Sequence, residues 1–364
     1  MIPLETLKQK EQKEQNHVSP DFVRISAASS MALRMQSGRF SREFKFGGIN
    51  ILLNYENGCL SDCGYCGLAR TRPGEYEEKS FIRVEWPLVN TEFLADRMAE
   101  HEANLTRLCI SMVTHGRAYK DTYEITKQIR EKVDTPLSLL IAPPVLNRER
   151  LQSYYDLGVD MIGVGLDAVS EEVFYKHRTD VPNGSLKWDN YWDIINISRD
   201  IWGPWKVNIH TVVGLGETDS DLIDIFYKLY ENQIFPYLFS FNPEPDSRMG
   251  DWDQPEITRW RRIQLVKHLI EYEDLKKSDI GFDDIGRMVS LNVDHIDLDN
   301  VIEAFDNVSP FKTDGCPDVE GEVGCTRPYG SYRPTETFRD FPFDPEKRDI
   351  ELIRSELKLE EILN

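Results

Sequence analysis

The sequence of 364 residues has no excess of positive charge. Lys and Arg together number 43, against 63 Asp and Glu, so the formal net charge is −20 at pH 7. A surface of that sign repels phosphate backbones. We therefore expect no nucleic-acid partner.

Long apolar runs are also missing. The longest candidate, from Leu137 to Leu146, is interrupted by Pro143 and Pro144, whereas a membrane-spanning helix needs roughly 20 consecutive apolar residues. The first residues, MIPLETLKQKEQKEQ, are charged and have no apolar centre of the kind found in signal peptides. These features predict a cytoplasmic protein without a membrane partner.

Cysteine is scarce, with six residues in the whole chain. That number is too small for a disulfide scaffold, so clustered cysteines in a reducing compartment predict metal ligands or catalytic groups. The chain also lacks a Gly-x-Gly-x-x-Gly motif after its first predicted strand, which argues against a dinucleotide-binding fold.

Short apolar segments alternate with longer amphipathic segments from residue 47 onward. Six strands are predicted, at 49–54, 107–113, 137–141, 161–166, 206–213 and 237–241. Seven helices are predicted, at 92–104, 119–132, 148–157, 170–177, 188–201, 220–232 and 256–273. This alternation is typical of βα units around a parallel sheet. About six units favour an α/β fold with a full or partial (β/α) barrel over a doubly wound sheet.

Three regions are expected along the chain. Residues 1–45 form an N-terminal extension with a helix over 20–37, and residues 46–280 form the barrel core. Residues 281–364 form a C-terminal segment whose cysteine-containing tail packs on the barrel, with a strand over 285–293 and a short helix over 297–305.

The first cysteine cluster lies in a loop that directly follows the first barrel strand. Its spacing is Cys59-x3-Cys63-x2-Cys66, with Tyr65 just before the last cysteine. Three thiolates are one short of the four that close a [4Fe–4S] cluster, so a cubane on them keeps one iron free for another ligand. Active sites of (β/α) barrels lie at the strand ends that such loops form. The alternative is a structural zinc site with a distant fourth ligand.

This spacing resembles the signature of the radical S-adenosylmethionine (SAM) superfamily. The resemblance implies that Cys59, Cys63 and Cys66 hold a [4Fe–4S] cluster whose free iron binds SAM. One electron then splits SAM into methionine and a 5′-deoxyadenosyl radical, which abstracts hydrogen from the substrate. The reactive chemistry belongs to the cofactor, and the protein orients and shields it.

The end of the fifth barrel strand adds to this resemblance. Its segment VGLGET (213–218) resembles the IVGLGET segment of biotin synthase and its relatives, in which this strand lies along the adenine of SAM. The resemblance implies the following SAM-binding residues: Tyr65, His115, Asp167, Arg178, Gly214, Gly216 and Glu217.

Other roles are open for several of these residues. Arg178 resembles an arginine that holds the SAM carboxylate, which suits a guanidinium, but it is equally compatible with a surface charge. Asp167 and Thr218 are also suited to capping helices. The Gly-Gly-Glu motif that many family members carry after strand two is replaced by Val-Thr-His-Gly (113–116).

The remaining cysteines are Cys109, in the second barrel strand, and Cys316 and Cys325, in a tail rich in Gly and Pro. The segment TRLCISM around Cys109 resembles TRFCMGA of biotin synthase, whose cysteine binds an auxiliary cluster. The two other auxiliary positions fall near Leu139 and at Asn208, and neither is cysteine. A core cysteine and a chance pair of thiols are the alternatives.

The tail resembles the cysteine-rich tails of biotin-synthase-related proteins, and Gly-Ser-Tyr-Arg (330–333) is similar to the Arg-Ser-Ser-Tyr segment of classical lipoyl synthase. These resemblances imply a second [4Fe–4S] cluster on Cys109, Cys316 and Cys325, with Ser331 as an optional fourth ligand. This hypothesis requires the tail to fold over the mouth of the barrel.

Much of the chain is similar to biotin-synthase-related proteins, and the CGLAR and VEWP segments are most similar to the second subunit of the two-protein lipoyl synthase of archaea and some bacteria. The resemblance implies a sulfurtransferase of lipoate biosynthesis that inserts sulfur into an octanoyl chain on a lipoyl domain or glycine cleavage H protein. Its partners would be a second radical SAM subunit and a ferredoxin- or flavodoxin-type electron donor. The alternatives are another radical SAM reaction, such as C-methylation or cofactor maturation, a non-catalytic iron–sulfur or zinc scaffold, and an inactive partner subunit.

Overall fold

Eight strands form one curved and mostly parallel sheet in the computed structural model, which describes residues 17–178, 186–303, 309–333 and 335–363. In spatial order the strands are β3 (Leu88–Asn90), β1 (Phe22–Ile25), β2 (Gly48–Leu53), β4 (Arg107–Ser111), β5 (Leu137–Ile141), β6 (Met161–Asp167), β7 (Val207–Val213) and β8 (Phe235–Ser240). Strands β2 and β4 to β8 are parallel neighbours, while β1 pairs antiparallel with β2 and β3. The fold is therefore a partial (β/α) barrel, and the six predicted barrel strands are confirmed.

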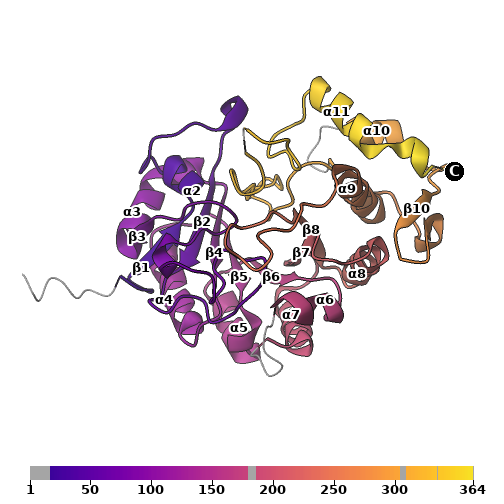
Figure 1. Cartoon of the computed structure of the whole chain (residues 1–364). Coiled ribbons are helices and arrows are strands. Elements are labelled where there is room, and N and C mark those ends of the chain that lie inside the picture. Colours follow the sequence, from indigo (N-terminus) through magenta and orange to yellow (C-terminus); the bar gives the residue numbers. More distant parts are fainter. Residues whose placement is uncertain (1–16, 179–185, 304–308, 334, 364) are drawn as a thin grey trace, which may run out of the picture.

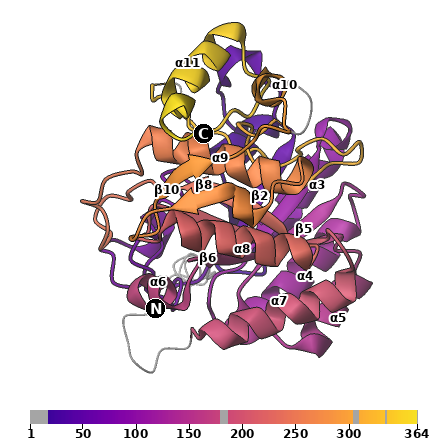
Figure 2. The ribbon, with the colours of Figure 1, turned by 90° about the vertical axis from the view of Figure 1, so that its right-hand side faces the viewer.

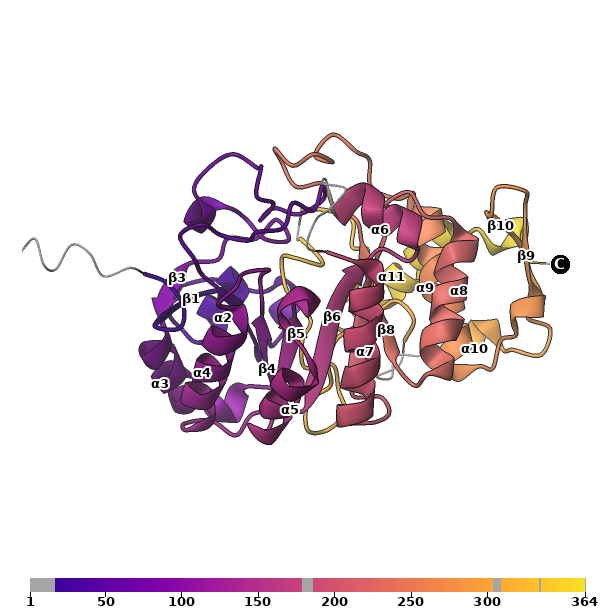
Figure 3. The ribbon, with the colours of Figure 1, turned by 90° about the horizontal axis from the view of Figure 1, so that it is seen from below.

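Helices cover the outer side of this sheet (Figure 3). They are α3 (Thr91–His101), α4 (Ala118–Arg130), α5 (Arg148–Asp156), α6 (Glu171–Arg178), α7 (Trp188–Trp202), α8 (Asp219–Glu231) and α9 (Ile257–Tyr272). All seven predicted helices are confirmed within a few residues. Short 3₁₀ turns lie at Ser41–Glu43, Tyr76–Glu78, Glu102–Asn104, Pro143–Val145, Lys277–Asp279 and Leu359–Glu361.

The two faces of the barrel strands differ in chemistry. Aliphatic residues such as Leu108, Ile110 and Ile209 are fully buried. The residues between them, such as Cys109 and Asn208, belong to the opposite face because successive side chains on a strand alternate. Burial of the aliphatic face against the helices stabilises the fold, and the polar face is available for a site.

The N-terminal extension differs from the prediction. A helix over 20–37 is wrong for its first part, because Phe22–Ile25 forms β1 and pairs with β2 through Val23 and Leu53. Ser26 then accepts a hydrogen bond from the Ser29 amide at 3.1 Å and caps the short helix α2 (Ala27–Ala32). A strand partner thus overrides a weak helical pattern. Residues 1–16 lie outside the described part of the chain.

The C-terminal segment begins with a two-stranded sheet of β9 (Ile280–Phe282) and β10 (Met288–Leu291), followed by α10 (Leu298–Glu303). The predicted strand over 285–293 and the described part of the predicted helix over 297–305 are confirmed. Helix α11 (Lys347–Leu357), which the sequence analysis missed, packs on α9 (Figure 2), where Arg261 donates to Glu356 at 2.7 Å.

The tail (309–343) lies along the open side of the sheet, between β8 and β2 (Figure 1). Asp314 accepts a hydrogen bond from the Leu238 amide of β8 at 2.7 Å, and Thr106 at the start of β4 donates to the Gly324 carbonyl at 2.9 Å. A Cβ on Gly48 would lie 2.8 Å from that same carbonyl, so only glycine permits this approach. The tail therefore fills the lateral opening, and further along the tail Arg327, Gly330 and Ser331 line the cavity at the carboxyl ends of the barrel strands.

Among the described residues, no helix is long and apolar enough to cross a bilayer.

We predict that Arg24→Leu strongly destabilises the fold. The Arg24 side chain is buried and donates to the carbonyls of Trp86 (2.9 Å), Tyr76 (3.0 Å) and Lys79 (2.6 Å), which ties β1 to the loop after the first cysteine cluster. Its loss leaves the carbonyls of Trp86 and Lys79 without this donor, while the Tyr76 carbonyl keeps the Lys79 amide, so the free energy of unfolding should fall by about 3 kcal/mol or more. Denaturant unfolding measures this change, and the exposed Arg39→Leu is the control. An equal effect of the two substitutions would contradict the prediction.

Candidate active site

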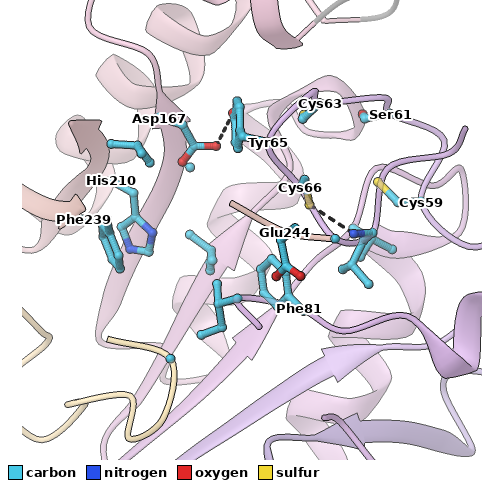
Figure 4. A pocket seen from close by; sticks show the side chains of 18 of the residues that line it. Cys59, Ser61, Cys63, Tyr65, Cys66, Phe81, Asp167, His210, Phe239 and Glu244 are labelled. Carbon is cyan, nitrogen blue, oxygen red and sulfur yellow. Dashed lines mark hydrogen bonds between the residues drawn. The ribbon is translucent and has the colours of Figure 1, made fainter. Parts of the chain in front are cut away.

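The loop after β2 brings its three cysteines to one cavity of about 250 Å³ at the carboxyl ends of the barrel strands (Figure 4). The loop is tied to two elements: the Leu60 amide donates to the Thr114 carbonyl after β4 at 2.8 Å, and the Gly64 amide donates to the His177 carbonyl of α6 at 2.7 Å. Cys59, Cys63 and Cys66 all line the cavity. The structure therefore places these three predicted site residues together.

Burial governs the protonation of these thiols. It raises the pKa of Cys63 to about 11, although the Arg178 guanidinium opposes the shift, and it raises the pKa of Cys66 well above its usual value. In the described part of the chain, no three His, Cys, Asp or Glu side chains could hold a single metal ion. A cubane makes a different demand, because each thiolate binds a different iron and the sulfurs need not meet at one point. The donor set therefore fits a cluster better than a zinc ion.

The cavity wall is largely apolar. From the strands it takes Leu52, Met112, Leu140, Val212 and Phe239. The segment after β8 contributes Phe241, Asn242 and Glu244. Glu244 is buried and accepts a hydrogen bond from Ser80 at 2.7 Å, so it fastens the segment to the loop after the cysteines.

Three of the predicted SAM-binding residues form one buried network. Asp167, at the end of β6, accepts hydrogen bonds from the Tyr65 hydroxyl and from Arg178, both at 2.6 Å (Figure 4 shows the first). Arg178 also donates to the Leu166 carbonyl and to the Tyr191 hydroxyl, both at 3.0 Å. The guanidinium is thus largely engaged within the protein, and the network holds Tyr65, and with it the cysteine loop, against β6.

The glycine-rich turn after β7 is organised by its own glutamate. Glu217 accepts from the amides of Gly214 (2.9 Å) and Leu215 (2.8 Å), and Thr218 caps α8. Gly214 and Gly216 have φ of 110° and 100°, which favour glycine. Within the described residues, the cavity takes His210 and Val212 from this strand, and none of Gly214, Gly216 and Glu217 lines it.

His115 lies beside the cavity entrance residue Thr114 but stacks on Tyr55, with ring centroids 3.8 Å apart. Burial lowers the pKa of His115. The structure gives this residue a packing role.

The other three cysteines meet inside the barrel although more than 200 positions separate Cys109 from the two in the tail. Cys325 donates to Asn50 of β2 at 3.3 Å, and Asn208 of β7 donates to Cys316 at 3.4 Å. The three thiols interact electrostatically with one another, and Ser138 contacts Cys109 and Cys316. We call Cys109, Cys316 and Cys325 the inner cysteines.

The inner cysteines lie below the floor of the cavity. Asn50 and Ser138 contact them, while Leu52 and Leu140, two positions further along the same strands, line the cavity. Two strand residues correspond to a rise of about 7 Å. Burial raises the pKa of Cys109 to about 12 and that of Cys316 to about 11, and Arg107 opposes the shift at Cys316.

Ser331 is placed differently from the inner cysteines, because it lines the main cavity together with Cys59 and Cys66. The polar side chains beside the inner cysteines are instead Asn50, Ser138 and Asn208. The sequence analysis named Asn208 only as a missing cysteine and did not single out the other two. In the sequence, Asn50, Ser138 and Asn208 could be recognised as polar residues at alternate positions of otherwise aliphatic strands.

Residues 53–228 match the family model described as the radical SAM superfamily. This match spans slightly less than half of the chain and includes the three-cysteine loop, so the matched segment is similar to the radical SAM superfamily. The similarity implies a [4Fe–4S] cluster and SAM as cofactors, and it makes the three-cysteine loop and its cavity the candidate active site.

The known proteins that the chain resembles are distant from it in sequence. A biotin synthase of Streptococcus agalactiae serotype V is 21% identical over 263 residues, which cover 70% of this chain and 75% of the relative. The FeFe-hydrogenase maturase HydG of Carboxydothermus hydrogenoformans has a TM-score of 0.47 at 16% identity, over 90% of this chain and 70% of that one. Methylornithine synthase (PylB) has a TM-score of 0.44 at 13% identity, over 62% and 61%.

We predict that Asp167→Asn loosens the three-cysteine loop. The substitution leaves the buried Arg178 without its charge partner and weakens the acceptor for Tyr65. Removal of one member of such a pair costs about 2–4 kcal/mol, and hydrogen exchange should speed up at the loop amides. The exposed Asp156→Asn is the matched control. Unchanged stability and unchanged exchange in the Asp167 variant would contradict the network's role.

Proposed function

We propose that this protein is a radical SAM enzyme that inserts sulfur into the octanoyl chain of a lipoyl carrier protein, together with a second radical SAM subunit. The observation that supports this most directly is the meeting of the inner cysteines below a cavity that also holds Cys59, Cys63 and Cys66. A substrate in that cavity would lie between a site that generates a radical and a site that can hold sulfide. The lipoyl carrier, the partner subunit and the electron donor follow from the sequence resemblance.

In this proposal Cys59, Cys63 and Cys66 bind the cluster that supplies reductive SAM cleavage. Tyr65, Asp167 and Arg178 keep the loop in place against β6. Arg178 would act mainly through this network. Any contact of Arg178 with SAM would use the guanidinium N–H that the network leaves unpaired. The apolar walls exclude water, which protects a carbon radical from side reactions.

The inner cysteines would bind a second [4Fe–4S] cluster, which supplies the sulfide for the new carbon–sulfur bond. Ser138 is the better candidate for a non-cysteine ligand than Ser331, because its side chain contacts Cys109 and Cys316. A hydroxyl ligand is more easily displaced than a thiolate, which suits a cluster that must open. Arg107, buried beside Cys316, offsets part of the negative charge of three thiolates.

The cavity suits an alkyl chain. The wall formed by Leu52, Leu140 and Phe239 is apolar. The inner cysteines lie below the cavity floor by a strand rise of about 7 Å. An extended chain can therefore present a carbon to both sites with little reorientation. His210 also lines the cavity, and burial lowers its pKa to about 3, so it stays neutral at physiological pH.

Two single substitutions test whether the two sets of cysteines have different roles. Cys63→Ala should abolish formation of 5′-deoxyadenosine, because the SAM cluster loses one of three ligands. Cys325→Ala should leave SAM cleavage largely intact and stop sulfur transfer to an octanoylated carrier. The two products are quantified by mass spectrometry in the same anaerobic assay.

Each variant serves as the control for the other, since both remove one buried or half-buried thiol. Undiminished 5′-deoxyadenosine in the Cys63 variant would refute the SAM-cluster assignment. Undiminished sulfur transfer in the Cys325 variant would remove the inner cysteines from the mechanism and leave a different radical SAM reaction.

A further inference from the structure

A second cavity, of about 290 Å³, lies between α9, β8 and the tail, and it shares the lining residue Asp340 with the cavity of the candidate active site. Both chain neighbours of Cys316, Gly315 and Pro317, line it. Tyr237 lines it as well and contacts Cys316. This cavity therefore reaches the inner cysteines from the outer side of the molecule. We call it the tail cavity.

The tail cavity contains unsatisfied polar groups. The Glu271 Oε1, Ser309 Oγ and Thr313 Oγ1 atoms line it, are buried, and have no hydrogen-bond partner within the protein. The Glu271 side chain is 7% exposed, and Ser309 and Thr313 are 7% and 2% exposed. Each buried polar group left unpaired costs about 1–3 kcal/mol. Three such groups on one wall point to a bound polar ligand.

The tail cavity offers hydrogen-bond donors beside three carboxylates, those of Glu271, Asp314 and Asp340. The Lys267 ammonium lies between Glu271 (2.8 Å) and Asp314 (3.2 Å), and these contacts use two of its three donors. A fixed cation between the carboxylates repels a divalent metal ion. The remaining ammonium N–H and the hydroxyls of Ser309 and Thr313 can all donate hydrogen bonds to an anion, while Glu271 Oε1 can accept a hydrogen bond from it.

The connection to the inner cysteines is short. Tyr237 is the side chain that touches Cys316 on one side and the tail cavity on the other. At the outer end, the exposed residues Gly321 and Tyr272 border the cavity. Access by this route does not pass through the main cavity, which SAM and substrate would occupy during turnover.

We propose that the tail cavity binds hydrosulfide and admits it to the inner cysteines. This inference rests on the proposed function, in which sulfur leaves the second cluster with the product and must be replaced. The hydrosulfide charge is met by Lys267, its lone pairs by the two hydroxyls, and its proton by Glu271. Passage requires no change of oxidation state.

Assembly of the second cluster tests this inference without any turnover assay. The parent protein carries Cys59→Ala, Cys63→Ala and Cys66→Ala, so only the inner cysteines remain. Ferrous iron and sodium sulfide are added anaerobically, and the growth of visible charge-transfer absorbance is followed with the iron bound per chain. In the finished protein, exchange of cluster sulfide with isotopically labelled sulfide is then measured by mass spectrometry.

Two blocking substitutions fill the tail cavity from different segments. Val323→Phe enlarges a lining residue between the tail cysteines, and Ser309→Phe does so from outside that loop. Val319→Phe is the matched control, because it makes the same change in the same loop at a side chain that is 81% exposed. Glu271→Gln tests the polar contact without changing the volume.

We expect both blocking variants to slow assembly and sulfide exchange by at least about tenfold, the effect of a barrier higher by roughly 1.4 kcal/mol. Val319→Phe should match the parent, and Glu271→Gln should weaken the dependence of the exchange rate on sulfide concentration. Equal exchange rates in the parent and both blocking variants would overturn the tail-cavity route while leaving the second cluster in place. A parent that binds no iron would instead overturn the second cluster, and with it the proposed function.

Discussion

The open side of the barrel is the constraint on which the site depends. The sheet ends at β8 on one side and at β3 on the other, and an edge strand presents backbone groups that need partners. At β8 the tail supplies such a partner, because Asp314 accepts from the Leu238 amide, and on the other side of the opening Gly324 approaches Gly48 and Thr106. Cys316 and Cys325 reach the barrel interior only because the tail fills this opening.

This arrangement stacks two cysteine sets along the strands. One set lies at the carboxyl ends, in a loop held by the contact between Tyr65 and Asp167, and the other lies about two residues below the cavity floor. Burial raises the pKa of thiols in both sets. Thiolates at these positions therefore need nearby positive charge, which iron supplies on coordination. For the inner set, metal binding and docking of the tail should stabilise each other.

The sequence was sufficient for the barrel and for the first cysteine set. Aliphatic strands alternating with amphipathic helices predict the βα order, and three cysteines within eight residues must be neighbours in any fold. Contacts between distant segments were harder to predict. The lateral position of the tail depends on an edge that only the assembled sheet creates, and β1 forms because β2 offers it a partner. Asn50 and Ser138 become candidate site residues only when the fold brings Cys325 and Cys316 beside them.

The central claim is that the chain holds two clusters, one on each cysteine set. The most direct test is a count of iron and sulfide on the anaerobically reconstituted full chain, with Mössbauer spectra to identify the cluster type. The account predicts about eight irons per chain, as two [4Fe–4S] clusters require. A count of about four, as for one such cluster, all of it lost with Cys63→Ala, would contradict it and remove the basis for sulfur insertion.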